Sequence, residues 1–220
     1  MSDLQILSVN IGRPEHVEGH AALTGICKHP VSGPITIGPL GVEGDAVMDT
    51  KNHGGFDQAV YLYGQPDYDF IAAETGREMS PGLFGENLTL AGLESQNIDI
   101  GDRFEVGALL FEVTSPRIPC ATFAARMRDP KWVKIFFAIN RPGVYVRVLR
   151  GGVIEAGMAV NHMPFTGPKV PLLELMYDYK NPAPERMRYL MQAPIHHDLV
   201  AKYEDRLAQG ELLAGTGTAP

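Results

Sequence analysis

The chain has 220 residues, 45% of them hydrophobic and 20% charged, which is ordinary for a globular protein that folds in water. Its formal net charge of −7 argues against a broad nucleic-acid surface, where Lys and Arg would have to cluster, so we expect no nucleic-acid partner. Two cysteines without a CxxC pair are too few for a disulfide framework, a structural zinc site or an iron–sulfur cluster held by thiolates.

The sequence also predicts a cytoplasmic protein without a membrane partner. No window approaches the roughly 20 apolar residues that a membrane span requires. The first residues show no basic segment followed by an apolar run, so we expect no signal peptide. The length suits one large domain, or one domain with an appendage.

Short apolar or alternating runs, punctuated by 24 glycines and 17 prolines, predict that residues 1–165 are mostly β. Because few of these runs are separated by helices, they favour a closed or partly closed β barrel over a doubly wound sheet. The predicted strands cover residues 4–11, 24–28, 35–40, 59–63, 88–90, 102–106, 109–114, 144–149 and 157–160. The predicted helices of this part cover residues 66–74, 121–128 and 130–139.

The pattern changes toward the C-terminus, where apolar residues recur at helical spacing and prolines separate the segments. Residues 166–212 are therefore expected to form a small three-helix module, with helices over residues 170–179, 184–192 and 197–208. The last stretch, residues 213–220, is rich in Gly and Thr and is expected to be a mobile tail.

Cys120 is the strongest candidate for chemistry. Pro119 suits the first position of a helix, which would place Cys120 in the first turn, where the helix dipole favours a thiolate. Arg117 adds a fixed positive charge nearby, although Ile118, at the expected cap position, cannot accept an N–H bond. A thiolate binds metals and attacks electrophiles, whereas the alternative is an inert core thiol, as we expect for Cys27 in its strand-like stretch.

The loop containing His53, Gly54 and Gly55 is a candidate anion site. Paired glycines allow positive φ and let backbone N–H groups approach an anion closely, although an ordinary Gly-Gly turn is the alternative.

Two other loops carry groups suited to a heterocyclic ligand with a phosphate. Gly85, Glu86 and Asn87 place a carboxylate and an amide beside a glycine, where they could hydrogen-bond to the edge of a heterocycle. Arg141 and Arg147 flank the start of a predicted strand, and the arginine fork suits phosphate. The alternatives are a plain turn with a solvated Glu and a pair of surface charges.

Taken together, these motifs resemble the MOSC family, named for the C-terminal domain of molybdenum-cofactor sulfurase. The resemblance covers residues 4–162 and is strongest to the stand-alone, YiiM-like branch that includes 6-N-hydroxylaminopurine reductases, in which a three-helix module often follows the barrel. The matching pieces occur in the family order: Gly-Val-Glu-Gly-Asp at 41–45, His-Gly-Gly at 53–55, Pro-Gly-Leu-Phe-Gly-Glu-Asn-Leu at 81–88, Ile-Gly-Asp at 100–102, Pro-Arg-Ile-Pro-Cys at 116–120, and the segment 141–147 with its two arginines.

The resemblance implies a β barrel like the barrel domain of pyruvate kinase, and a molybdenum-dependent reductase that converts N–OH to N–H. It implies that Cys120 is the protein ligand of molybdenum in a pyranopterin cofactor, with Arg117 close to the Mo–S bond. The remaining cofactor-binding candidates are His53, Gly54, Gly55 and Arg141 or Arg147 for the phosphate, and Gly85, Glu86 and Asn87 for the pterin edge or metal pocket.

Electrons for such a reaction must come from a separate reductase, because the chain has neither a GxGxxG unit nor enough cysteines for a cluster. The helical module has three expected uses: docking of that reductase, formation of a homodimer, or covering an apolar face of the barrel.

Other readings stay open on sequence alone. Cys120 could instead hold a persulfide as a sulfur carrier, or the domain could bind and deliver the pterin without turnover. A zinc hydrolase is the least favoured reading, because the adjacent His196 and His197 cannot share one helical face and HExxH is absent.

Overall fold

The computed structural model describes residues 4–50 and 53–215, with side chains described through residue 210. Eight strands form one large sheet, in which neighbouring strands are antiparallel except for one parallel pair. In spatial order the strands are β11 (Asn161–Met163), β7 (Arg103–Val106), β8 (Leu109–Pro116), β9 (Val144–Arg150), β5 (Val60–Gly64), β6 (Leu88–Ala91), β1 (Gln5–Gly12) and β2 (Lys28–Val31). The parallel pair is β5 with β6.

The sheet curls into a partly closed barrel. The segment that leads into β11 returns to the start of β1, where the N–H of Ile6 donates to the carbonyl of Met158 over 2.9 Å and the N–H of Val160 donates to that of Leu4 over 2.9 Å. A second sheet of three short strands covers part of the barrel. These strands are β10 (Gly152–Ile154), β3 (Ile35–Gly38) and β4 (Gly41–Val42).

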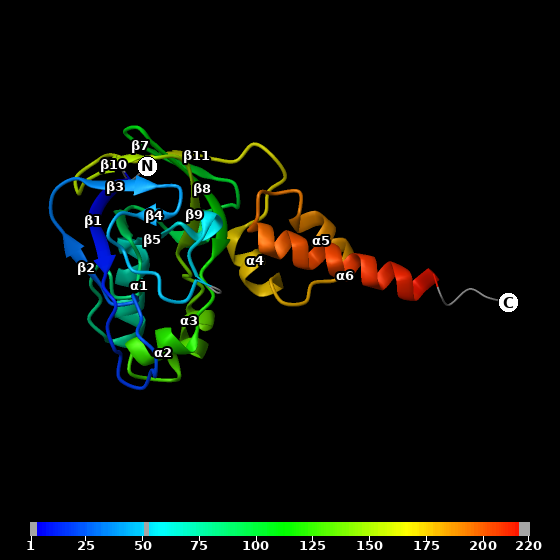
Figure 1. Ribbon diagram of the computed structural model, residues 1–220, viewed down its shortest axis with the longest axis horizontal. Coiled ribbons are helices and arrows are strands. Elements are labelled where there is room, and N and C mark those ends of the chain that lie inside the picture. The colour runs from blue at the N-terminus through cyan, green and yellow to red at the C-terminus, as the bar shows by residue number, and fades with distance from the viewer. Residues whose placement is uncertain (1–3, 51–52, 216–220) are drawn as a thin grey trace.

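Helices gather at two places on this β-rich body (Figure 1). The first group packs over one end of the barrel and comprises α1 (Gln65–Thr75), α2 (Ala121–Arg126) and α3 (Trp132–Ile139). The second group lies to one side and comprises α4 (Leu172–Asp178), α5 (Pro184–Leu190) and α6 (His197–Gly215). Single 3-10 turns occur at η1 (Phe56–Gln58) and η2 (Ser95–Asn97). The predicted fold class, mostly β with a few helices, is confirmed.

The C-terminal helices share the apolar core of the barrel. Leu172, Leu175, Leu190 and Tyr203 are buried in the same cluster as the inward-facing residues of the large sheet. The helices therefore cover an apolar face of the barrel, which was one of their expected uses. A second, aromatic core lies beneath α1, α2 and α3 and centres on Phe84, whose ring meets five aromatic neighbours edge to face.

Several local predictions need correction. The strand expected over 24–28 starts only at Lys28, where β2 begins, and Thr24 makes an isolated bridge with Glu15. Between them Gly25 packs directly on the carbonyl of Ala46, where a Cβ atom would lie 1.9 Å from the oxygen. Residues 157–160 form a turn and a bridge instead of a strand. Of the tail expected over 213–220, residues 213–215 instead belong to α6, and residues 216–220 lie outside the described residues.

No helix in the described part of the chain is long and apolar enough to cross a membrane.

Candidate functional site

Cys120 lies at the N-cap of α2, with φ −123° and ψ 176°. The helix begins at Ala121, so Pro119 precedes the cap instead of taking the first helical position. Cys120 therefore stands at the edge of the helix and not inside its first turn. The thiol is partly exposed and contributes to the walls of two cavities. A reactive group in this position adjoins both cavities.

The surroundings of Cys120 favour the thiolate. Burial alone would raise the pKa of the thiol, but the His53 side chain, the Arg117 guanidinium and the backbone N–H of Phe123 outweigh it and lower the pKa from 9.0 to about 6. Cys27 shows the opposite behaviour, because burial and the nearby Glu15 raise its pKa to about 11. Only Cys120 is therefore prepared to react or to ligate near neutral pH.

Arg117 supplies the fixed cation of the site. The side chain is buried, and its Nη1 atom donates a hydrogen bond to the carbonyl of Phe84. Its guanidinium carbon lies 4.8 Å from the ring centroid of Phe123 and 5.2 Å from that of Tyr61. The Nε atom is buried and has no hydrogen-bond partner among the described residues. A buried donor without a partner next to a thiolate is suited to an anionic ligand.

The small cavity has a volume of about 290 Å³ and combines an apolar lining with a few charged and polar side chains. Its wall carries a buried ion pair, in which Nζ of Lys28 lies 2.5 Å from Oδ1 of Asp45. Asn87 donates from Nδ2 to Oδ2 of Asp45 over 2.9 Å, and burial lowers the pKa of Lys28. Sequence reasoning missed Lys28 entirely and quoted Asp45 only as part of a matching motif, because a pairing across 17 residues leaves no local signal.

The large cavity, of about 780 Å³, lies between the barrel and the C-terminal helices. Tyr179 from the end of α4 and Lys202 from α6 form its far wall, and Phe56, 61% exposed, lies on the barrel side. The two cavities share a wall made of Asp49, His53, Gly54, Gln58, Thr122, Tyr145 and Cys120.

Most of the predicted site residues are brought together by the fold. The small cavity is lined by His53, Gly54, Gly85, Asn87, Arg117 and Cys120, and Gly55 lines the large one. Glu86 lies elsewhere: it is fully buried and accepts hydrogen bonds from the hydroxyl of Tyr68 over 2.8 Å and the N–H of Gly82 over 2.6 Å. Its carboxylate therefore organises the loop that carries Gly85 and Asn87, and lines neither cavity.

The two predicted phosphate-binding arginines also lie outside the lining of both cavities. Arg141 is paired with Asp67, and Nε of Arg147 lies 3.1 Å from Oδ1 of Asp57. Arg147 also donates from Nη2 to the carbonyl of Pro194 over 2.8 Å. Their guanidinium groups thus have carboxylate partners that are far away in the sequence.

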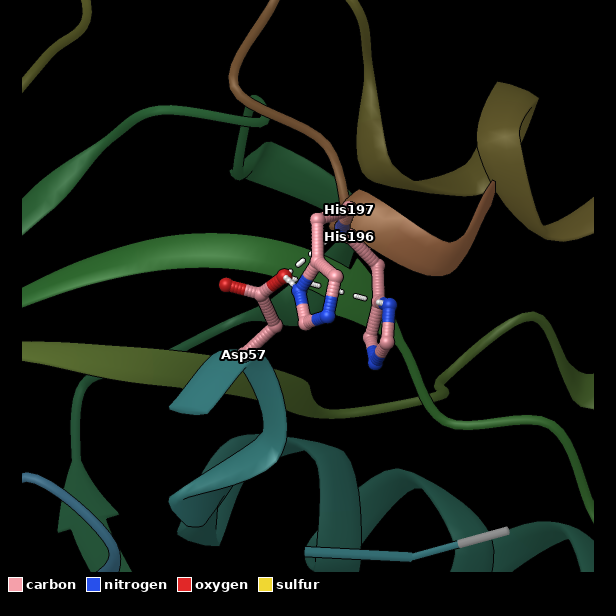
Figure 2. Close-up of side chains that lie close together, drawn as sticks. All are labelled: Asp57, His196 and His197. Atoms are coloured by element: carbon pink, nitrogen blue, oxygen red, sulfur yellow. Dashed lines mark hydrogen bonds and ion pairs between the residues drawn. The ribbon is translucent and has the colours of Figure 1, made fainter. Parts of the chain in front are cut away.

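His196 and His197 meet the same carboxylate, contrary to the expectation that adjacent histidines face apart. His196 precedes α6 and His197 begins it, so the two rings stack with centroids 5.2 Å apart, and both approach Asp57 (Figure 2). Burial would raise the pKa of Asp57, but hydrogen bonds from His197 and the charge of Arg147 lower it. The periodicity of a helix does not govern residues at its very start.

Comparison with known proteins places this geometry in a family. The model of the MOSC domain matches residues 49–161, and the chain belongs to the MOSC family. It is 36% identical to YflK of Bacillus subtilis over 69% of this chain and 70% of that protein. It is 31% identical to a protein named reductase from Gibberella moniliformis over 77% of this chain, which is 31% of that longer protein.

A crystal structure of YiiM from Geobacillus stearothermophilus has the same fold. It superimposes with a TM-score of 0.73 and 27% sequence identity, over 93% of this chain and 99% of the other. Because the match extends beyond the barrel, the arrangement of C-terminal helices beside the barrel is common to both proteins. The MOSC membership and the reductase name of one relative agree with an oxidoreductase role.

Proposed function

We propose that this protein binds a molybdenum–pyranopterin cofactor through Cys120 and reduces N-hydroxylated compounds. The observation that carries the proposal is an accessible thiol with a pKa of about 6 at the junction of two cavities. Thiolates are soft ligands suited to metals of this kind. Membership of the MOSC family and similarity to a reductase and to YiiM support the same reading.

The residues of the small cavity fit such a cofactor. Cys120 offers the sulfur ligand, and the buried Nε of Arg117, which has no partner among the described residues, offers a donor to an anionic group beside it. Gly54 and Gly85 have positive φ, which lets the backbone approach a ligand closely. Asn87 offers an amide edge for a heterocycle, and His53 a ring N–H donor for phosphate. When bound, the cofactor supplies two-electron redox chemistry at the metal.

The reaction that we propose is R–NHOH + 2 e⁻ + 2 H⁺ → R–NH₂ + H₂O, in which the N–O bond breaks and its oxygen leaves as water. The chain's own part is to keep Cys120 ionised, orient the substrate and exclude bulk water. The large cavity gives an N-hydroxylated substrate access to the Cys120 side of the shared wall. We further propose that a separate redox protein supplies the electrons.

The test compares two cysteine variants expressed in a host that makes the cofactor. Cys120→Ser should lose bound molybdenum and the reduction of 6-N-hydroxylaminopurine by a chemically reduced viologen dye. Cys27→Ser should retain both, because Cys27 lines neither cavity. Normal metal content and turnover in Cys120→Ser would refute the proposal.

Two alternatives have distinct signatures in the same experiment. A sulfur carrier would show a mass gain of one sulfur atom on Cys120 and no stoichiometric molybdenum. A delivery module would carry molybdenum but leave the hydroxylated base unchanged.

A further inference from the structure

The geometry points to a second metal site, independent of the proposed cofactor. We propose that Asp57, His196 and His197 bind a divalent transition-metal ion of the Zn²⁺ type, and that this ion joins the C-terminal helices to the barrel. Figure 2 shows the three side chains converging from two distant parts of the chain, Asp57 from η1 and both histidines from the entry to α6.

The spacing of the donor atoms suits one ion. One carboxylate oxygen of Asp57 and one ring nitrogen of each histidine lie within 4.8 Å of one another. Oδ2 of Asp57 lies 3.9 Å from Nδ1 of His196 and is hydrogen-bonded to Nδ1 of His197. Because Zn–N and Zn–O bonds are about 2.1 Å long, two ligands on a tetrahedral ion lie about 3.4 Å apart, so only small side-chain rotations are needed.

The donor set is chemically appropriate. Two imidazoles and one carboxylate are a common ligand combination for Zn²⁺ and for Fe²⁺. The His197 ring and Asp57 are already hydrogen-bonded to each other. A metal ion would take the place of that hydrogen bond and add His196 as a third ligand.

A second layer of contacts holds the donors in place, as in known metal sites. Nε of Arg147 lies 3.1 Å from Oδ1 of Asp57, the oxygen that the His197 ring does not contact. Arg147 also donates to the carbonyls of Pro194 and Ile195, which fixes the segment just before the histidines. The N–H of His196 donates to the carbonyl of Thr114 over 3.2 Å, so the histidine segment is anchored on β8.

The site remains open for further ligands. His197 is 67% exposed at its side chain, and both histidines line the large cavity together with Asp57. Water from this cavity can therefore complete the coordination of a four-coordinate ion. The competing view is that the residues form only a hydrogen-bonded tie between barrel and helices, with no affinity for metal.

The experiment uses untagged full-length protein carrying Cys120→Ser, so that the reactive thiol cannot bind the added ion. Titration with Zn²⁺ should show one tight site per chain, and the melting temperature should rise with Zn²⁺ concentration, because the ion binds the folded state. Co²⁺ should give the visible absorption of a low-coordinate complex. This background carries no cofactor ligand at position 120, so the outcome does not depend on the proposed reductase.

His197→Gln in the same background separates the two views, because the glutamine amide can still donate to Asp57 but offers no imidazole. It should weaken Zn²⁺ binding at least tenfold while leaving the metal-free melting temperature nearly unchanged. His196→Ala should weaken binding similarly, whereas His29→Ala, which removes an exposed histidine on β2, should leave it intact. Binding that persists in His197→Gln and His196→Ala, or absence of the site in the parent, would overturn the proposal.

Discussion

Nη1 of Arg141 lies 2.8 Å from Oδ1 of Asp67, a carboxylate whose side chain has no exposed surface. The same carboxylate accepts hydrogen bonds from the backbone and the hydroxyl of Ser95, and the arginine stacks 4.4 Å from the ring centroid of Phe70. The pair joins α1 to the loop before β9. This ion pair gives Arg141 a structural role that could not be predicted from the neighbouring residues in the sequence.

Removing Arg141 should therefore cost stability. Arg141→Met leaves Asp67 buried without its cation, and we expect the free energy of unfolding to fall by about 3–5 kcal/mol. Urea unfolding measures the loss, and Arg141→Met combined with Asp67→Leu should recover part of it. An unchanged stability together with loss of bound molybdenum would instead favour the phosphate-binding role that the sequence predicts.

Cys120 should be alkylated by iodoacetamide in a pH-dependent way that reflects its low pKa. The thiolate is the reacting form, so the rate should rise as pH increases through about 6 and level off above pH 7. Cys27, whose pKa is raised to about 11, should stay inert over this range. Mass spectrometry of peptides from Cys120→Ser and Cys27→Ser assigns the rates. A Cys120 profile that still rises at pH 9 would contradict the expectation.

His53 should be responsible for part of this effect. His53→Ala removes a hydrogen bond that favours the thiolate, so the midpoint of the alkylation profile should move to higher pH. His20→Ala is the matched control, because His20 lines the same cavity and does not contribute to the lowered pKa of Cys120. An equal shift in both variants would mean that the effect is not local.

Gly85 should not tolerate a side chain. Its φ is +80°, and a Cβ atom there would lie 2.9 Å from Cγ1 of Ile26 and 3.1 Å from its carbonyl oxygen. Gly85→Ala should therefore lower stability by more than Gly33→Ala, which has φ +82° and open space around it, and for which we expect about 1–2 kcal/mol. Thermal unfolding of the two variants compares them, and equal losses would show that the contact with Ile26 relaxes freely.

The β-rich fold was predictable because its signals are local. Alternation in residues 4–11, the turn between β7 and β8, and the glycine after α1 each show in a few consecutive residues, and the structure has the corresponding elements. The strand prediction failed over residues 24–27, where Gly25 packs closely against the backbone of Ala46, a residue 21 positions away in the sequence. Local patterns carry no information about such contacts.

The same distinction holds for the candidate site: residues in local motifs could be predicted, and pairings between distant residues could not. Cys120 and Arg117 were found because they lie three residues apart in one motif, and His53 and Gly54 because they are adjacent. The ion pair of Arg147 could not be predicted, because its carboxylate partner Asp57 is 90 residues away, in another element. Charge pairing across the fold decides which arginines remain available for a ligand, and no spacing rule in one sequence discloses it.

The shared wall at Cys120 has a consequence for inhibitor chemistry. An electrophile carried on a scaffold shaped for the large cavity could bond to the sulfur without entering the small one. A reversible compound occupying the small cavity would also lie beside Cys120, which lines that cavity too. Cys120 can thus be inhibited selectively by compounds bound in either cavity. A substitution that prevents binding in one cavity would leave the other cavity available.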